Sequence, residues 1–230
     1  MKYLVTIIIS TLAFINTEAQ TFSAGARTGL GYNVDLSRVG AKDIGGYSTD
    51  QFTWDKELYA RVETNKRIAV EARFTHYKLS DSYIYPENIG DIMVSPTIQF
   101  TYWDSKSTTN VIVGGISAQV DLTCPYMQDH CPMLKNIRNY IGFDVAGTYA
   151  REVINQENTD PTYQVAPRKY DDKYYFMQYG ISHTIIYQVS PSLNINTALR
   201  AMIQPSEFSS YTYSPSNTHI SGVFGVGYTF

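Results

Sequence analysis

The C-terminal residues of the chain alternate between large apolar and small or polar side chains. The large side chains occupy every second position: Phe224, Val226, Tyr228 and Phe230. Because successive side chains of a strand point to opposite faces, this pattern predicts a β-strand with one apolar face. Strands of this kind need a second sheet or a lipid against that face, so two fold classes follow: a β-sandwich or a membrane-spanning β-barrel.

The N-terminus has the pattern of an export signal. Lys2 precedes an apolar run over residues 4–15, and the small residue Ala19 follows shortly after. This order predicts a signal peptide over residues 1–19, with cleavage after Ala19. The apolar run is shorter than the roughly 20 residues that cross a bilayer, which argues against a membrane anchor. Residues 20–230 are then expected to form a single domain.

The composition of this domain favours the barrel over a soluble sandwich. The mean hydropathy is −0.23, and a barrel has such a value because polar residues inside it dilute the lipid-facing ones. The chain has 20 Tyr against 10 Phe and 2 Trp. Tyrosine collects at membrane interfaces, where its ring is buried and its hydroxyl group stays hydrated.

Alternating patterns predict the strands of an all-β, antiparallel up-and-down transmembrane barrel. Nine segments alternate clearly: 22–34, 52–62, 68–79, 92–103, 111–122, 140–153, 174–188, 193–204 and 220–230. A barrel with both ends in the periplasm needs an even number of strands. The segment Thr162–Tyr170 is the candidate for a further crossing. We therefore expect ten strands, with eight as the alternative.

The opposite faces of these strands predict a charged lumen. The residues expected to point inward are Arg27, Asp55, Glu57, Arg61, Glu63, Glu71, Arg73, Asp121, Asp144 and Arg200. A barrel of eight to ten strands is barely wider than its own side chains. Both signs of charge occur on neighbouring strands, so these residues are expected to form an ion network that plugs the lumen. Lys56 falls on the lipid face, where its chain can reach up to the headgroups.

Two cysteines, Cys124 and Cys131, lie close together in a predicted loop. In an exported protein such a pair predicts a disulfide. Together with His130 they are too few to complete a zinc site, so we expect no metal and no cofactor. The net charge of −3 gives no basic field for nucleic acid.

Three possible catalytic groups occur, and none has a convincing arrangement. The Asp129–His130 and Asp171–Asp172 doublets hold adjacent residues, which point apart on an extended chain. His183 lies on the apolar face of its strand, unless a bulge turns it inward. We therefore expect no enzymatic activity, with an outer-membrane hydrolase as a remote alternative.

Taken as a whole, residues 20–230 resemble the small outer-membrane β-barrels of the OmpA and OmpX type. In that family, an ending such as Phe224, Val226, Tyr228 and Phe230 acts as an assembly signal for the barrel-assembly machinery. The Ala19–Gln20 start and the Gly-rich Tyr/Phe ending are similar to such proteins from Bacteroidota. The resemblance implies an outer-membrane location and a monomer in contact with outer-membrane lipid.

The same resemblance leaves the function open. It implies a structural or surface-binding role, with a possible extracellular ligand or envelope protein as partner through the loops. A narrow channel for small hydrophilic solutes is the first alternative. A hydrolase or an accessory barrel of a secretion machine is the second.

Overall fold

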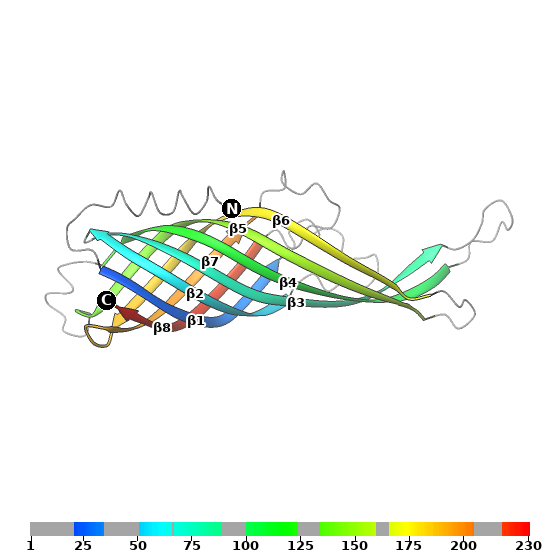
Figure 1. Ribbon diagram of the computed structural model, residues 1–230, viewed down its shortest axis with the longest axis horizontal. Helices are drawn as coiled ribbons and strands as arrows, with labels where there is room; N and C mark the ends of the chain where they lie inside the picture. Colours follow the sequence, from blue (N-terminus) through cyan, green and yellow to red (C-terminus); the bar gives the residue numbers. More distant parts are fainter. Residues whose placement is uncertain are drawn as a thin grey trace.

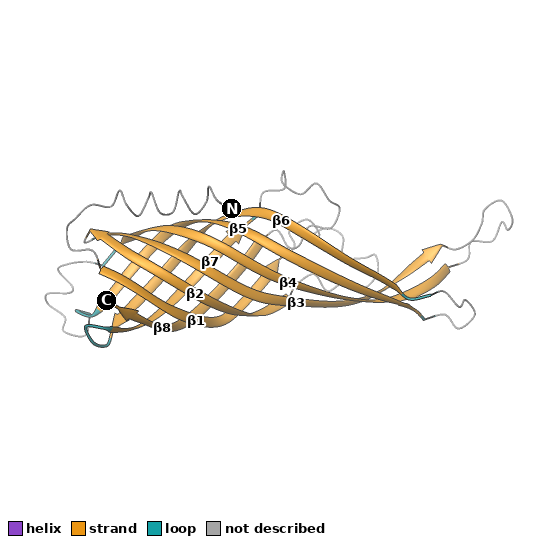
Figure 2. Ribbon diagram, in the orientation of Figure 1, coloured by secondary structure: helices purple, strands orange, loops and turns teal. Residues whose placement is uncertain are grey.

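The computed structural model describes residues 21–34, 51–65, 67–88, 100–123, 134–159, 166–204 and 218–230. They form a closed barrel in which each strand pairs antiparallel with the next and β1 pairs with β8 (Figure 1). The strands are β1 Thr21–Val34, β2 Gln51–Asn65, β3 Ile68–Asn88, β4 Phe100–Asp121, β5 Ile137–Asn158, β6 Arg168–Gln188, β7 Leu193–Ile203 and β8 Thr218–Thr229. Short turns complete the described residues (Figure 2). In these ranges, no helix is long and apolar enough to cross a bilayer.

The predicted all-β barrel is confirmed, but it has eight strands, the alternative count, and the expected ten is wrong. Residues 92–99 of the expected crossing at 92–103 lie outside the described residues, and its residues 100–103 are continuous with the expected crossing at 111–122, because β4 runs without a break from Phe100 to Asp121. The turn expected at 104–110 pairs with β3 on one side and β5 on the other. Its polar residues suggested a turn, but a strand that extends beyond the lipid needs no apolar face.

The crossing expected at Thr162–Tyr170 has the same explanation. Its last residues, 168–170, are the start of β6, which continues to Gln188. Tyr170 pairs with Ile154 in the same ladder that joins β5 and β6 further down. The rest of the expected segment, up to residue 165, lies outside the described residues. What looked like an additional crossing is therefore the outer part of a long strand.

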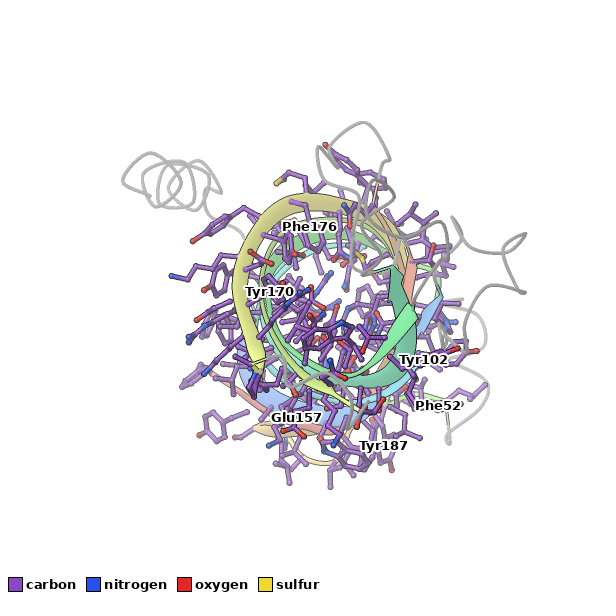
Figure 3. The ribbon with its side chains drawn as sticks, turned by 90° about the vertical axis from the view of Figure 1, so that its right-hand side faces the viewer. Phe52, Tyr102, Glu157, Tyr170, Phe176 and Tyr187 are labelled. Atoms are coloured by element: carbon purple, nitrogen blue, oxygen red, sulfur yellow. The ribbon has the colours of Figure 1, made fainter. Side chains whose placement is uncertain are left out.

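The polarity of the barrel is the reverse of that of a soluble protein. Leu58, Phe143 and Ile181 point outward and are more than half exposed, whereas Arg61 and Glu71 are fully buried inside. Viewed along the barrel, side chains fill the lumen and others, including Phe52 and Tyr187, radiate outward (Figure 3). An apolar band around a polar lumen is the arrangement of a membrane-spanning barrel. The soluble sandwich is thereby excluded, and the chain is an outer-membrane barrel.

The wall of the barrel is much taller on one side. Strands β3 to β6 have 21 or 22 residues each, whereas β1, β2, β7 and β8 have 11 to 15. The tall strands continue together past the short ones, away from the end where β1 begins and β8 finishes (Figure 1). The short turn between β6 and β7, residues 189–192, lies at that terminal end. Since periplasmic turns are short and extracellular loops long, the extension faces the cell exterior.

Glycines allow β1 and β8 to approach closely where the ring closes. A Cβ at Gly225 would lie 1.9 Å from the backbone oxygen of Ala26, and one at Gly25 would lie 2.1 Å from that of Val226. A Cβ at Gly29 would meet the backbone oxygen of Gly222 at 2.0 Å. Backbone atoms cannot move aside as the end of a flexible side chain can. The closure seam therefore requires glycine at these positions.

We predict that Gly225→Ala prevents the barrel from closing, because the added methyl group overlaps the backbone of β1. The measurement is the fraction of protein that migrates as the compact, heat-modifiable form on a gel. Gly147→Ala is the matched control, since the nearest atom to its Cβ would be Met177 Sδ at 3.9 Å. Equal folded fractions for the two variants would contradict the explanation.

Candidate functional site

Four charged side chains from four strands meet at the centre of the lumen. Arg27 donates hydrogen bonds to Glu57 at 2.8 Å and to both carboxylate oxygens of Glu71 at 2.7 and 2.9 Å. From the opposite wall, Arg200 donates to both oxygens of Glu57 at 2.6 and 3.0 Å and to Glu71 at 3.0 Å. Each arginine thus binds both glutamates. We call these four residues the central quartet.

Two further arginines extend the quartet. Arg61 lies 3.6 Å from Glu71, contacts Gln119 and stacks over the ring of Tyr140 at 3.8 Å. Arg73 forms an ion pair with Asp144. In the same way Arg27 stacks over a tyrosine, Tyr59, at 3.8 Å. The tyrosine rings cover the faces of the guanidinium groups, and the carboxylates accept hydrogen bonds from the guanidinium N–H groups.

The charges of the deep lumen balance. Away from the periplasmic end, four arginines of the described strands, Arg27, Arg61, Arg73 and Arg200, lie with four buried carboxylates, Asp55, Glu57, Glu71 and Asp144; a fifth, Asp121, is buried nearer the periplasm. A buried charge is costly unless it is paired and hydrogen-bonded, and here each arginine has a carboxylate within 4 Å. The arrangement fills the centre of the lumen with paired charges, although Arg61 Nη2 and Arg200 Nε are buried without a hydrogen-bond partner among the described residues.

The remaining predicted lumen residues also point inward, at the periplasmic end. Glu63 is partly exposed and accepts hydrogen bonds from Tyr140 at 2.8 Å and Arg61 at 3.3 Å. Asp121 pairs with Arg138 at 3.1 Å. Both Glu63 and Asp121 lie outside the central quartet.

A buried histidine above the quartet was not anticipated as part of the lumen. One ring nitrogen of His219 lies 2.8 Å from Asp55 Oδ2, and the other lies 2.9 Å from Asn33 Oδ1. The ring stacks on Tyr77 at 4.4 Å. We call Asn33, Asp55, Tyr77 and His219 the His219 cluster. The alternation of β8 contained the signal, since His219 is two residues before the inward Ser221.

Other residues singled out from the sequence lie on the lipid face or outside the described residues. Lys56 points outward in register with His76 of β3. His183 also stays on the outer face, half-buried, with Nε2 2.6 Å from Asn139 Oδ1, so the bulge considered for it does not occur. Phe224, Val226, Tyr228 and Phe230 all point outward and are exposed. The signal peptide, Cys124, Cys131, Asp129 and His130 fall outside the described residues, and their predictions remain predictions.

The extracellular extension carries its own polar contacts. Arg151 donates two hydrogen bonds to Asp171, at 2.9 and 2.6 Å, on its outer face. The hydrogen bond from Arg151 holds the pKa of Asp171 below its usual value. On the inner face, the guanidinium group of Arg168 lies over the ring of Trp103 at 4.3 Å, which joins β6 to β4 across β5. Across the described strands, no group of three His, Cys, Asp or Glu is placed to hold a metal ion.

We predict that Glu71→Gln destabilises the barrel by about 3–5 kcal/mol, because it leaves Arg27 and Arg200 buried with one carboxylate between them. The free energy of unfolding is measured by denaturant titration of the barrel in lipid vesicles. Asp171→Asn is the control, since it breaks a fully exposed ion pair and should leave the titration midpoint unchanged. A midpoint for Glu71→Gln equal to that of the wild type would contradict the prediction.

Comparisons with known proteins give structural neighbours only. No protein-family model matches the chain, and no curated protein matches it. Among solved structures, Neisserial surface protein A is 12% identical over 92% of this chain and 98% of its own, with a TM-score of 0.47. Ail, the attachment invasion locus protein of Yersinia pestis, is 11% identical over 93% and 100%, with a TM-score of 0.45. A major outer membrane protein from Thermus thermophilus is 9% identical over 93% and 100%, with a TM-score of 0.48. By its own closed ring of eight strands and its reversed polarity, this chain is an integral outer-membrane β-barrel protein.

Proposed function

We propose that this protein is a plugged, non-enzymatic barrel that presents its extracellular extension as a binding surface. One observation carries the proposal: β3 to β6 continue beyond the ends of the strands beside them. The pairing of β2 with β3 reaches only to Lys56 and His76, although β3 continues to Asn88. The pairing of β6 with β7 starts only at Tyr179, although β6 begins at Arg168.

Among the described residues, the extension is a four-stranded sheet in which β3 and β6 are the outermost strands. Among the described strands, Tyr77–Asn88 pairs with β4 and Arg168–Gln178 pairs with β5, and the extracellular part of each segment is the part from Lys78 and from Lys173 outward. Charged residues occur along the extension, among them Lys78, Lys106 and Lys169. Such residues keep an extracellular surface hydrated when no partner is bound.

The central quartet supports a plug and argues against the narrow channel. Arg27 and Arg200 reach across the lumen to the same two glutamates, so their hydrogen bonds lie across any path along the barrel axis. A solute could pass only if these buried ion pairs separated. Separation would leave charges unpaired in a narrow space, which is costly.

The candidate catalytic groups support a non-enzymatic role. His219 and Asp55 form a couple of the kind that activates a nucleophile, but both ring nitrogens of His219 already face side-chain oxygens. His219 is also buried, so a substrate has no access to it. His183 points toward lipid, and Asp171 is held by Arg151 on the outer face. We therefore propose that the His219 cluster ties β1, β2, β3 and β8 together above the quartet.

We predict that the refolded wild type shows no discrete conductance steps in a planar bilayer, and that the double variant E57S/R200S does. The double substitution removes one charge of each sign, so it opens space without leaving an unpaired ion. The variant R151S/D171S removes an exposed pair of the same kind and should stay silent. Discrete steps from the wild type would favour the channel over the plug.

A second experiment tests the binding surface. Ser80 and Thr108 are register partners on β3 and β4, so the hairpin can be cut there and closed by an Asn-Gly turn without disturbing the barrel below. We predict that cells displaying the shortened chain adhere less to immobilised extracellular-matrix proteins than cells displaying the full chain. Heat-modifiable migration of both proteins verifies the fold. Equal adhesion of the two strains, each above cells without the protein, would contradict the role of the extension.

A further inference from the structure

Two glycines on the lipid face have no reason within the fold to be glycine. Gly114 of β4 and Gly147 of β5 are direct register partners and both point outward. A Cβ at Gly114 would meet nothing within 4 Å, and one at Gly147 only Met177 Sδ at 3.9 Å. The seam glycines, by contrast, would meet backbone at about 2 Å. A glycine inside a strand weakens it and often marks a place where a ligand or another backbone approaches closely.

The glycine pair forms the floor of a recess in the lipid-facing wall. Its volume is about 450 Å³, within the range of small-molecule sites. The side chains around the floor are mainly apolar: Ile112 of β4, Tyr149 of β5, and Tyr175 and Met177 of β6. The rings of Tyr149 and Tyr175 lie 5.0 Å apart on the extracellular side of the glycines. The recess is therefore an apolar slot that ends below two tyrosines.

Cations follow directly beyond the tyrosines. Arg151 and Lys173 are register partners, each two residues past Tyr149 and Tyr175 toward the extracellular end. On the adjoining strands, Lys78 pairs with Asn110, and Asn110 pairs with Arg151, so a third cation lies in the same register row. The outward carboxylate of Asp171 neutralises part of this charge through Arg151. With three cations against one carboxylate, the rim above the apolar slot keeps a net positive charge.

We propose that the recess binds one acyl chain of a phosphate-bearing lipid of the outer leaflet, with its phosphate held by Lys173 and Arg151. The parts of such a lipid match the wall in order from the membrane core outward. Its acyl chain matches the apolar slot, its polar linkage lies at the level of the tyrosine hydroxyls, and its phosphate lies at the level of the cations. A second copy of the barrel on this face would bring the two cation rims together, and the like charges would repel. Burial of one chain against the glycine floor separates this lipid from the others around the barrel.

The experiment measures lipid retained by the full chain, purified in mild detergent, with native mass spectrometry. The probe is bisphosphorylated lipid A, and dephosphorylated lipid A is the comparison. Gly114→Leu places a side chain in the recess, and its Cβ would have no protein atom within 4 Å. It should lower retention about tenfold, equivalent to about two methylene groups excluded from the slot. Ala118→Leu adds a similar side chain to the same face of β4, below the recess, and should retain lipid A as the wild type does.

Lys173→Gln tests the phosphate contact separately. It should weaken retention of bisphosphorylated lipid A and leave that of the dephosphorylated form unchanged. Should Gly114→Leu fail to fold, Gly147→Val fills the same recess from the neighbouring strand. The proposal is overturned if Gly114→Leu retains lipid as the wild type does, or if Ala118→Leu loses as much, which would mean annular lipid only. It is equally overturned if Gly114→Leu abolishes a dimer and leaves lipid retention unaltered.

Discussion

The central quartet is the interaction on which the rest of the barrel depends. Arg27, Glu57 and Glu71 come from β1, β2 and β3, and Arg200 comes from β7, so one hydrogen-bonded group joins β7 to three strands with which it shares no backbone ladder. In the plug that we propose, neither arginine can move without leaving two carboxylates short of partners. The quartet is also the reason why we expect no channel conductance from the wild type. The proposed function therefore lies on the outer surfaces of the barrel.

The alternation of side chains predicted the two faces well, because it depends only on strand geometry. The ten predicted lumen residues all lie on the inward side of their strands, and Phe224, Val226, Tyr228 and Phe230 point to lipid, whereas Val223 of β8 points inward. Which charges meet could not be predicted, since that requires the register between strands. His219 shows the limit: its place two residues before Ser221 puts it inside, but only the pairing of β8 with β1 places it beside Asn33.

The strand count failed for a physical reason. Hydrophobic alternation is imposed by lipid, so it stops where the strand leaves the membrane although the ladder continues. Asp104 and Lys106 lie in the middle of a paired strand, and a rule that seeks apolar alternation interprets them as a turn. The same rule divided β6 at Tyr170. The extension that carries the proposed function was therefore the part that the sequence pattern concealed.

The row of polar residues above the recess has a consequence for the accuracy of folding. Alternation guards against a slip of one residue, which would turn every side chain to the wrong face. It does not guard against a slip of two, which keeps each face intact. In the native register Asn110 faces Arg151, and a two-residue slip of β5 toward the periplasm would set Arg151 beside Ile112, in the lipid. The outer polar row thus penalises a misalignment that an alternating sequence would otherwise tolerate.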